Sequence, residues 1–162
     1  FLFEDVTEKF RQLETGTVPV PKSVKPNLGL KVLVVDDVET NLLIAETMLK
    51  EIGCTVKIAR SGQEAITWAE RNDADAILMG LQMTDMSGTA AAIELTKRRG
   101  DRPIPCFAWT ADVTSLQGLG SPEFNWAGRI LKPVTVDNLL TALRHVRPQK
   151  TPGPDRPLLK AV

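Results

Sequence analysis

Short apolar runs alternate with amphipathic stretches along the middle of the chain. Five runs of three to six mostly apolar residues are typical of strands buried on both faces: residues 31–35, 55–59, 76–79, 104–109 and 129–131. Helical spacing of apolar residues marks the stretches that begin at Val38, Ser61, Ser87 and Thr135, and the second of these opens with SGQE, a capping box. This alternation predicts an α/β fold, a doubly wound five-stranded parallel sheet with helices on both faces.

The helix signal is weak in one strand–helix unit of this pattern. Residues 111–127 occupy the place of the fourth helix, but they contain two glycines and Pro122. Each glycine costs a helix interior about 1 kcal/mol and the proline about 3 kcal/mol, so this helix is expected to be short, irregular or absent. Aromatic residues on such loops often anchor contacts, which makes Phe124 and Trp126 candidate interface residues.

Prolines concentrate near both ends of the chain and divide it into three segments. Residues 1–28 are predicted to form an amphipathic helix and a proline-rich linker, because prolines leave too few backbone donors for regular structure. Residues 29–147 have the length of a single globular domain. Residues 148–162 form a proline-rich tail or a second linker.

The first fourteen residues carry one apolar stripe. Phe3, Val6, Phe10 and Leu13 lie at helical spacing, with most charged side chains elsewhere on the helix. Such a stripe has to be buried against this domain, a second copy of the chain or an upstream module. Phe3 and Phe10 are therefore candidate interface residues.

Composition and charge narrow the class of protein. The chain has 162 residues, 43% of them hydrophobic, with 20 Lys and Arg against 20 Asp and Glu. Zero net charge argues against a nucleic-acid or membrane-surface binder. No apolar run approaches the ~18 residues of a membrane span and no basic leader opens the chain, so a cytoplasmic domain without membrane insertion is expected. Cys54 and Cys106 lie in apolar runs and are interpreted as buried hydrophobic residues rather than a disulfide or zinc site.

Polar residues follow the carboxyl ends of the predicted strands. Asp36 and Asp37 come directly after the first strand, and Lys132 comes after the fifth. The fourth strand ends near Thr110, whereas the third ends in Gly80. Because the carboxyl ends of parallel strands meet at one edge of the sheet, we expect these five residues to cluster, and we refer to them as the pit. Adjacent carboxylates suit Mg²⁺, and a lysine beside a hydroxyl suits a phosphoryl group, but the pit lacks a nucleophile.

Four motifs, in order, resemble the receiver domain of two-component signalling proteins. They are VLVVDD, AILMGLQMTDMSG, AWTA and LKP, and the resemblance extends over residues 30–147. The stretch VDDVETNLLIAETMLKEIG is most similar to the receivers attached to hybrid sensor histidine kinases. The resemblance implies the flavodoxin-like receiver fold, with strand order 2-1-3-4-5.

The resemblance also implies roles for the residues of the pit. Asp36 and Asp37 match the acidic pair that binds Mg²⁺ in the family. Thr110 matches the hydroxyl residue that follows the phosphoryl group during activation, and Lys132 matches the invariant lysine. Pro133 follows this lysine, where the family usually has a cis peptide.

Four features depart from the family pattern. Gly80 stands where the phosphoacceptor aspartate is expected, and glycine has no side chain on which an acyl phosphate can form. Thr84 replaces a loop proline, Arg129 replaces the aromatic switch residue, and the weak segment 115–127 replaces the fourth helix of the output face. The loss of both acceptor and switch indicates a degenerate receiver, or pseudo-receiver.

The missing carboxylate has consequences for the pit. With two carboxylates instead of three, the pit is expected to hold Mg²⁺ weakly or not at all. Lys132 has lost its natural partner and is expected to pair with Asp37 or Asp36. The position of Gly80 is expected to leave an empty volume that a water or small anion fills. Thr110 is interpreted as a residue that satisfies backbone groups at its strand end.

These features favour a regulatory module without enzymatic activity. It would act by binding a protein or a small ligand such as a cyclic dinucleotide, inside or beside a hybrid histidine kinase. An alternative is a receiver in which Asp85, Asp36 or Asp37 accepts the phosphoryl group, or an ordinary receiver in which Gly80 is an engineered substitution. A remote alternative is a Mg²⁺-dependent phosphatase with Asp36 as nucleophile, which needs a further acid at the end of the third strand.

Overall fold

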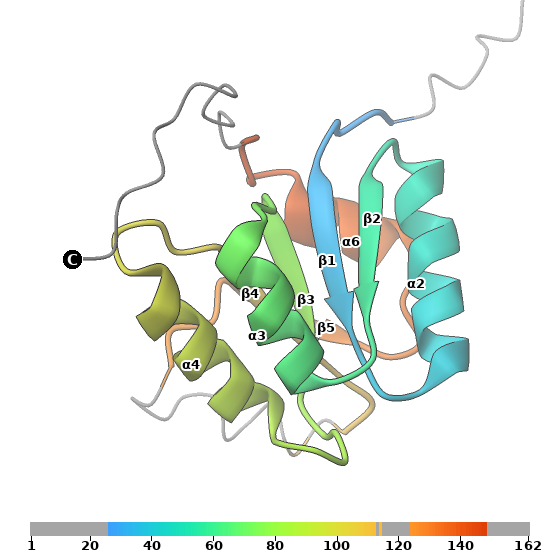
Figure 1. The fold of residues 1–162 in the computed structure, drawn as a ribbon. Coiled ribbons are helices and arrows are strands. Elements are labelled where there is room, and N and C mark those ends of the chain that lie inside the picture. The colour runs from blue at the N-terminus through green and yellow to red at the C-terminus, as the bar shows by residue number, and fades with distance from the viewer. Residues whose placement is uncertain (1–25, 113, 115–123, 149–162) are drawn as a thin grey trace, which may run out of the picture.

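The computed structural model describes residues 26–112, 114 and 124–148, which form a parallel five-stranded sheet between two layers of helices (Figure 1). The strand order is β2-β1-β3-β4-β5, as predicted. In chain order the elements are β1 (Lys31–Val35), α2 (Glu39–Glu51), β2 (Thr55–Ala59), α3 (Gly62–Arg71), β3 (Ala76–Gly80), α4 (Gly88–Arg99), β4 (Cys106–Thr110), β5 (Gly128–Leu131) and α6 (Val136–Leu143). β4 begins two residues later than the apolar pattern predicts, because Pro105 has no N–H to donate to the ladder.

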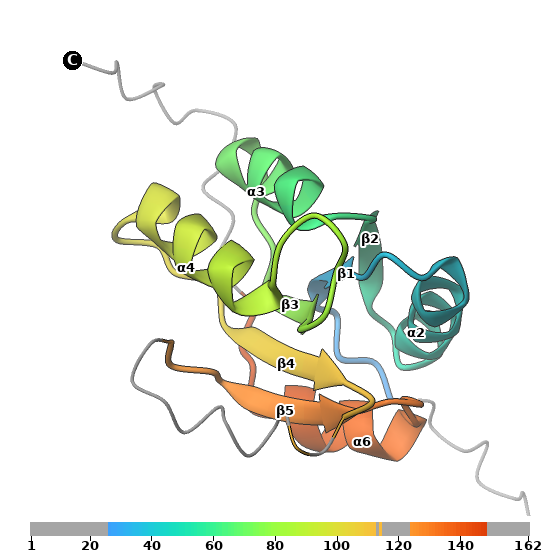
Figure 2. The same ribbon diagram turned by 90° about the horizontal axis from the view of Figure 1, so that it is seen from below.

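Helices cover both faces of the sheet (Figure 2), and each face has its own core. Val32 and Val34 of β1 point to the face covered by α2 and α6, whereas Leu33 and Val35 point to the face covered by α3 and α4. All five residues of β3 and all five of β4 are buried. A strand in the middle of a doubly covered sheet needs apolar residues at every position, which is why these runs lack polar alternation.

The helices begin at residues that satisfy their free backbone donors. The Ser61 hydroxyl accepts a hydrogen bond from the Glu64 N–H at 3.0 Å, and the Glu64 carboxylate accepts one from the Arg60 N–H at 2.9 Å. The predicted serine cap of α3 is therefore confirmed, whereas Glu64 accepts from the N–H of the residue before the cap and not from the Ser61 N–H of a full capping box. The hydroxyls of Ser87 and Thr135 cap α4 and α6 in the same way.

The two cysteines are buried and free, as predicted. Burial raises the pKa of the Cys106 thiol to about 12, and burial also raises the pKa of Cys54. Neither side chain therefore offers a reactive thiolate at neutral pH.

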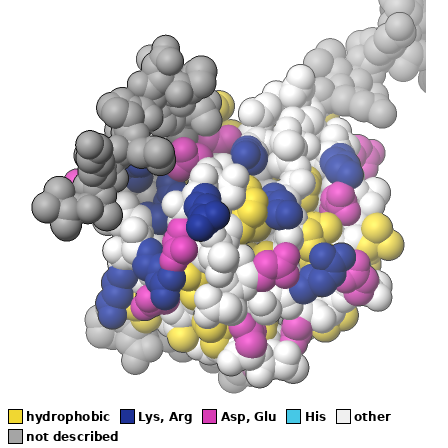
Figure 3. Space-filling model, viewed as in Figure 1, with side chains coloured by type: hydrophobic (Ala, Val, Ile, Leu, Met, Phe, Trp, Pro, Cys, Tyr) yellow, Lys and Arg dark blue, Asp and Glu magenta, His cyan; other side chains and the backbone are white. Residues whose placement is uncertain are grey.

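Charged side chains of both signs are interspersed over the face that α2, α3 and α4 present (Figure 3). Several form ion pairs, among them Arg60 with Glu39 and Arg98 with Glu94. Within the described residues, no helix is both long and apolar enough to cross a membrane.

Three predictions concern residues outside the described part of the chain. The amphipathic helix with Phe3 and Phe10 and most of the first linker precede residue 26. The weak unit falls largely within residues 115–123, and the tail predicted at 148–162 is described only at its first residue. The predicted structures of these segments therefore stay predictions.

Candidate functional site

The sheet brings the residues of the pit to one edge. Asp36 follows β1 directly, and its N–H donates to the Ala59 carbonyl at 3.2 Å. The N–H of Lys132, just after β5, donates to the Thr110 carbonyl at 2.9 Å. Gly80 ends β3, between these two pairs of strands. The juxtaposition expected from the parallel topology is therefore present.

Asp36 and Lys132 form an ion pair at the centre of the pit. The Asp36 side chain is 1% exposed and that of Lys132 is 16% exposed, so water screens the pair little. The second carboxylate oxygen of Asp36 accepts hydrogen bonds from the Val38 N–H at 2.8 Å and from the Asn41 amide at 3.4 Å. The predicted ion pair is confirmed, and of the two aspartates it uses Asp36.

A tryptophan lies beneath the ammonium group. The Nζ atom of Lys132 is 4.6 Å from the centre of the Trp109 ring, and Trp109 is 1% exposed. A cation at this distance over an indole face is attracted by the electrons of the ring. The sequence shows Trp109 as a strand residue and contains no signal for this contact. Lys132 is thus held in the pit by two contacts, the ion pair with Asp36 and the cation–π contact with Trp109.

Asp37 contacts a different part of the chain. Its Oδ2 atom accepts a hydrogen bond from the Thr84 N–H at 2.9 Å, which joins the loop after β1 to the loop after β3. Proline, the residue usual in the family at position 84, has no N–H. Thr84 therefore supplies a hydrogen-bond donor that the family pattern lacks. The sequence identified the substitution but not this consequence.

The space beside Gly80 is already occupied. A Cβ atom at this position would lie 3.0 Å from the Val35 carbonyl oxygen and 3.3 Å from Oδ2 of Asp36. The position of a Cβ atom at Gly80 is therefore crowded and not empty, and the expected empty volume farther along a side chain stays a prediction. The Asp36 carboxylate lies against the Gly80 backbone, where it meets Lys132.

Thr110 plays the structural part that was expected of it. It is 4% exposed, and its hydroxyl oxygen accepts a hydrogen bond from the Asp112 N–H at 3.1 Å. This bond satisfies a backbone donor just after β4. Pro133 follows Lys132 through a cis peptide bond, as the family resemblance implies.

The residues present do not fit a magnesium site. The described residues contain no group of three His, Cys, Asp or Glu side chains placed to hold one ion. The two carboxylates available are engaged: Asp36 pairs with Lys132, and Asp37 accepts from a backbone N–H. Mg²⁺ requires several oxygen ligands in near-octahedral geometry, which this pair does not supply alone.

Asp85, the alternative phosphoacceptor, lies at the N-terminus of α3. Its Oδ1 accepts a hydrogen bond from the Gly62 N–H at 3.2 Å, and its Oδ2 accepts one from the Gln63 N–H at 3.0 Å. Burial raises the pKa of the Asp85 carboxyl. The hydrogen bonds from backbone donors, those of Gln63 and Gly62 foremost, lower it by more than burial raises it, so the pKa lies below its ordinary value. Asp85 is thus a capping residue supplied from a distant loop.

Replacing Asp85 by alanine is expected to lower the free energy of unfolding by about 1 kcal/mol at neutral pH. Because folding lowers the pKa of this carboxyl, its contribution is present above the ordinary aspartate pKa and is lost as the pH falls through the folded-state value. Urea unfolding of Asp85→Ala and the native chain at neutral and acidic pH measures this difference. Asp85→Asn, which keeps one acceptor oxygen, is the control. A difference that persists unchanged in strong acid would contradict the assignment.

The remaining predicted residues lie on or near β5. Arg129, at the switch position, is exposed. Phe124 and Trp126 pack edge to face, with ring centres 4.8 Å apart, and rest half-buried against the core on the α3 and α4 side. This packing accounts for their burial, and their role in an interface stays a prediction.

Comparison with known proteins defines the class. The profile of the response regulator receiver domain matches residues 32–144, so the chain belongs to this family. Among its relatives is the aerobic respiration control sensor protein ArcB of Escherichia coli, 38% identical over 112 residues, which are 68% of this chain and 13% of ArcB. The histidine kinase BarA of Escherichia coli is 27% identical over 152 residues, 91% of this chain and 16% of BarA. The chain thus spans less than a fifth of each of these relatives.

Solved structures agree with the fold. The receiver domain of the sensor histidine kinase PA1611 from Pseudomonas aeruginosa, solved with a magnesium ion in its active-site cleft, is 27% identical with a TM-score of 0.64. The match covers 72% of this chain and 96% of that one. The chemotaxis protein CheY4 of Vibrio cholerae has a TM-score of 0.66 at 24% identity over 74% of this chain and 99% of its own, a likeness of fold alone.

Proposed function

We propose that this chain is a receiver module that does not accept a phosphoryl group and that regulates a signalling protein by binding. The observation that carries the proposal is Gly80, at the end of the central strand β3, where the receiver pattern has an aspartate. Phosphotransfer to a receiver forms an acyl phosphate, which requires a carboxylate oxygen as nucleophile. Glycine supplies none.

The engagement of the other acids near the pit supports the proposal. Asp36 is buried and paired with Lys132, so its attack on a phosphoryl donor would have to break this pair. Asp37 accepts from the Thr84 N–H, and both oxygens of Asp85 accept from backbone donors of α3. Each carboxylate therefore has a structural partner that competes with phosphoryl transfer.

The relatives suggest the setting of the module. ArcB and BarA are named as a sensor and a histidine kinase, and this chain matches only a small share of each. We infer that the chain is part of a hybrid sensor kinase, on the cytoplasmic side, and is not itself an enzyme. Its partners are then kinase domains of the same protein or another signalling protein, with a small ligand such as a cyclic dinucleotide as a further candidate. In this proposal residues 29–147 are the receiver, residues 1–28 an amphipathic helix and a proline-rich linker, and residues 148–162 a proline-rich tail or linker.

Intact-protein mass after incubation with acetyl phosphate and Mg²⁺ tests the proposal. In a phosphorylated receiver, the phosphoryl group moves to a carboxylate oxygen and acetate leaves. The native chain is expected to gain no phosphoryl mass. Gly80→Asp is expected to gain one phosphoryl group, and Gly80→Asn, which has the same shape without a carboxylate, is the matched control.

The three proteins separate the alternatives. Phosphorylation of the native chain would overturn the proposal, and peptide mapping would then identify Asp85, Asp36 or Asp37 as the acceptor. Phosphorylation of Gly80→Asp alone would assign the loss of phosphotransfer to this single position. If neither is modified, the proposal holds for the native chain, and the Asp36–Lys132 pair and the Thr84–Asp37 bond become further causes of inactivity.

A further inference from the structure

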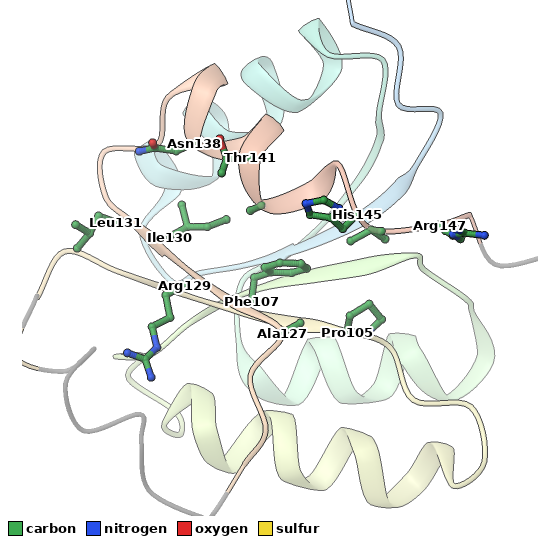
Figure 4. A pocket seen from close by; sticks show the side chains of 13 residues that line it. Pro105, Phe107, Ala127, Arg129, Ile130, Leu131, Asn138, Thr141, His145 and Arg147 are labelled. Carbon is green, nitrogen blue, oxygen red and sulfur yellow. The ribbon is translucent and has the colours of Figure 1, made fainter.

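An open groove lies between the edge strand β5 and helix α6 (Figure 4). Its volume is about 840 Å³, and Phe107, Ile130 and Ala142 provide an apolar floor. His145 and Arg147 lie at the end where α6 finishes, and Arg129 extends from β5 toward the other face of the sheet. Among the described residues, no acidic side chain lines the groove. Since Arg129 points away, the positive charge at the groove is that of Arg147, and the groove suits an apolar segment with an acidic side chain near that end.

The chain enters the domain near this groove. Figure 1 shows that the chain reaches β1 and leaves α6 at the same end of the sheet, opposite the pit. Leu28 and Leu30, just before β1, pack in the same core as Val146. From β1 to β5 the sheet has three strand spacings, or about 14 Å. Residues 15–25 can extend over roughly 36 Å, so the segment before them reaches the groove.

The first fourteen residues match the groove in chemistry. Their apolar stripe, Phe3, Val6, Phe10 and Leu13, would extend over ~15 Å as a helix, and β5 with its four residues is ~13 Å long. The segment contains four acidic and two basic side chains, so its net charge is opposite to that of the groove.

The alternative occupants fit less well. Residues 149–162 begin beside Arg147, but they contain three prolines and an excess of basic over acidic side chains. A second copy of the domain would bring the same basic groove against itself. Opposite charge thus favours the N-terminal segment.

We propose that residues 1–14 dock as an amphipathic helix in the β5–α6 groove of their own chain. The apolar stripe lies on the floor of the groove, and the acidic side chains face its basic end. The inference rests on the groove and the segment, and it holds whether or not Gly80 prevents phosphorylation.

Amide hydrogen exchange of the full chain, read by mass spectrometry, tests the docking. Phe10→Gln removes one residue of the stripe, and Arg11→Gln, its neighbour on the polar side, is the matched control. On the domain, Ala142→Glu blocks the floor, and Arg147→Glu reverses a basic charge without touching the core. Lys57→Glu, on β2 at the opposite edge of the sheet, is the control for these two.

In the native chain, amides of residues 1–14 are expected to exchange about tenfold more slowly than in Phe10→Gln or Ala142→Glu. Arg147→Glu is expected to have an intermediate effect, and the two controls none. Docking is overturned if residues 1–14 are unprotected, or if their protection survives both Ala142→Glu and Arg147→Glu. Protection that increases with protein concentration would assign the groove to a second copy, and protection confined to residues 149–162 would assign it to the tail; either result also overturns the proposal.

Discussion

Replacing Lys132 by methionine is expected to lower the free energy of unfolding by about 3 kcal/mol. The substitution leaves the Asp36 carboxylate, which is 1% exposed, without its cationic partner. A buried charge that loses its partner typically costs a protein 3–5 kcal/mol. The lower end of that range applies here, because the hydrogen bonds from Val38 and Asn41 to Asp36 remain. Urea unfolding of Lys132→Met and the native chain measures the loss.

A double variant distinguishes the charge effect from lost packing. In Asp36→Asn with Lys132→Met, no unpaired charge is buried, so a large part of the lost stability is expected to return. If the double variant is as unstable as the sum of the two single variants, Lys132 contributes through its packing on Trp109 and not through the ion pair. A loss below about 1 kcal/mol in Lys132→Met would show that water reaches Asp36 and screens its charge.

The second large effect is expected at Gly88, the first residue of α4. A Cβ atom here would collide with the carbonyl oxygen of Gly80 and lie 2.9 Å from the Cα of Leu81. These are backbone atoms of a strand end, and the Gly88 N–H also donates to the Leu81 carbonyl at 2.9 Å. Neither side can move without breaking this contact, so Gly88→Ala is expected to cost about 3 kcal/mol.

Gly62, the first residue of α3, offers a control for the same substitution. A Cβ atom there would meet Cγ and Sδ of Met86 at 2.6 and 2.8 Å. Methionine is a flexible side chain that can change rotamer, so Gly62→Ala is expected to cost about 1 kcal/mol or less. The two alanine variants are compared by thermal and urea unfolding. Equal losses would show that the loop after β3 yields as easily as a side chain, contrary to the expectation for Gly88.

Much of the fold could be predicted because its signals are local. The apolar runs of β3 and β4 indicate strands buried on both faces, and the parallel topology then brings Asp36, Gly80 and Lys132 to one edge. The serine cap of α3 was also predictable, since its two partners are three residues apart.

The partners within the pit could not be chosen from the sequence. Two aspartates follow β1, and only the direction of each side chain decides that Asp36 meets Lys132 while Asp37 meets the Thr84 N–H. The crowding at Gly80 follows from the same geometry, because the Val35 carbonyl oxygen and the Asp36 carboxylate both lie there. Likewise, Asp85 caps a helix more than twenty residues earlier in the chain, a contact for which no local pattern exists.

The Asp36–Lys132 pair has an evolutionary consequence. In a receiver that transfers phosphoryl groups, natural selection retains these residues for chemistry. Here the same two side chains connect the ends of β1 and β5, and a substitution of either is expected to destabilise the fold. Selection for a stable fold would therefore be sufficient to retain both residues in any receiver that did not transfer phosphoryl groups. The presence of this aspartate and lysine in a sequence is consequently only weak evidence that a receiver is phosphorylated.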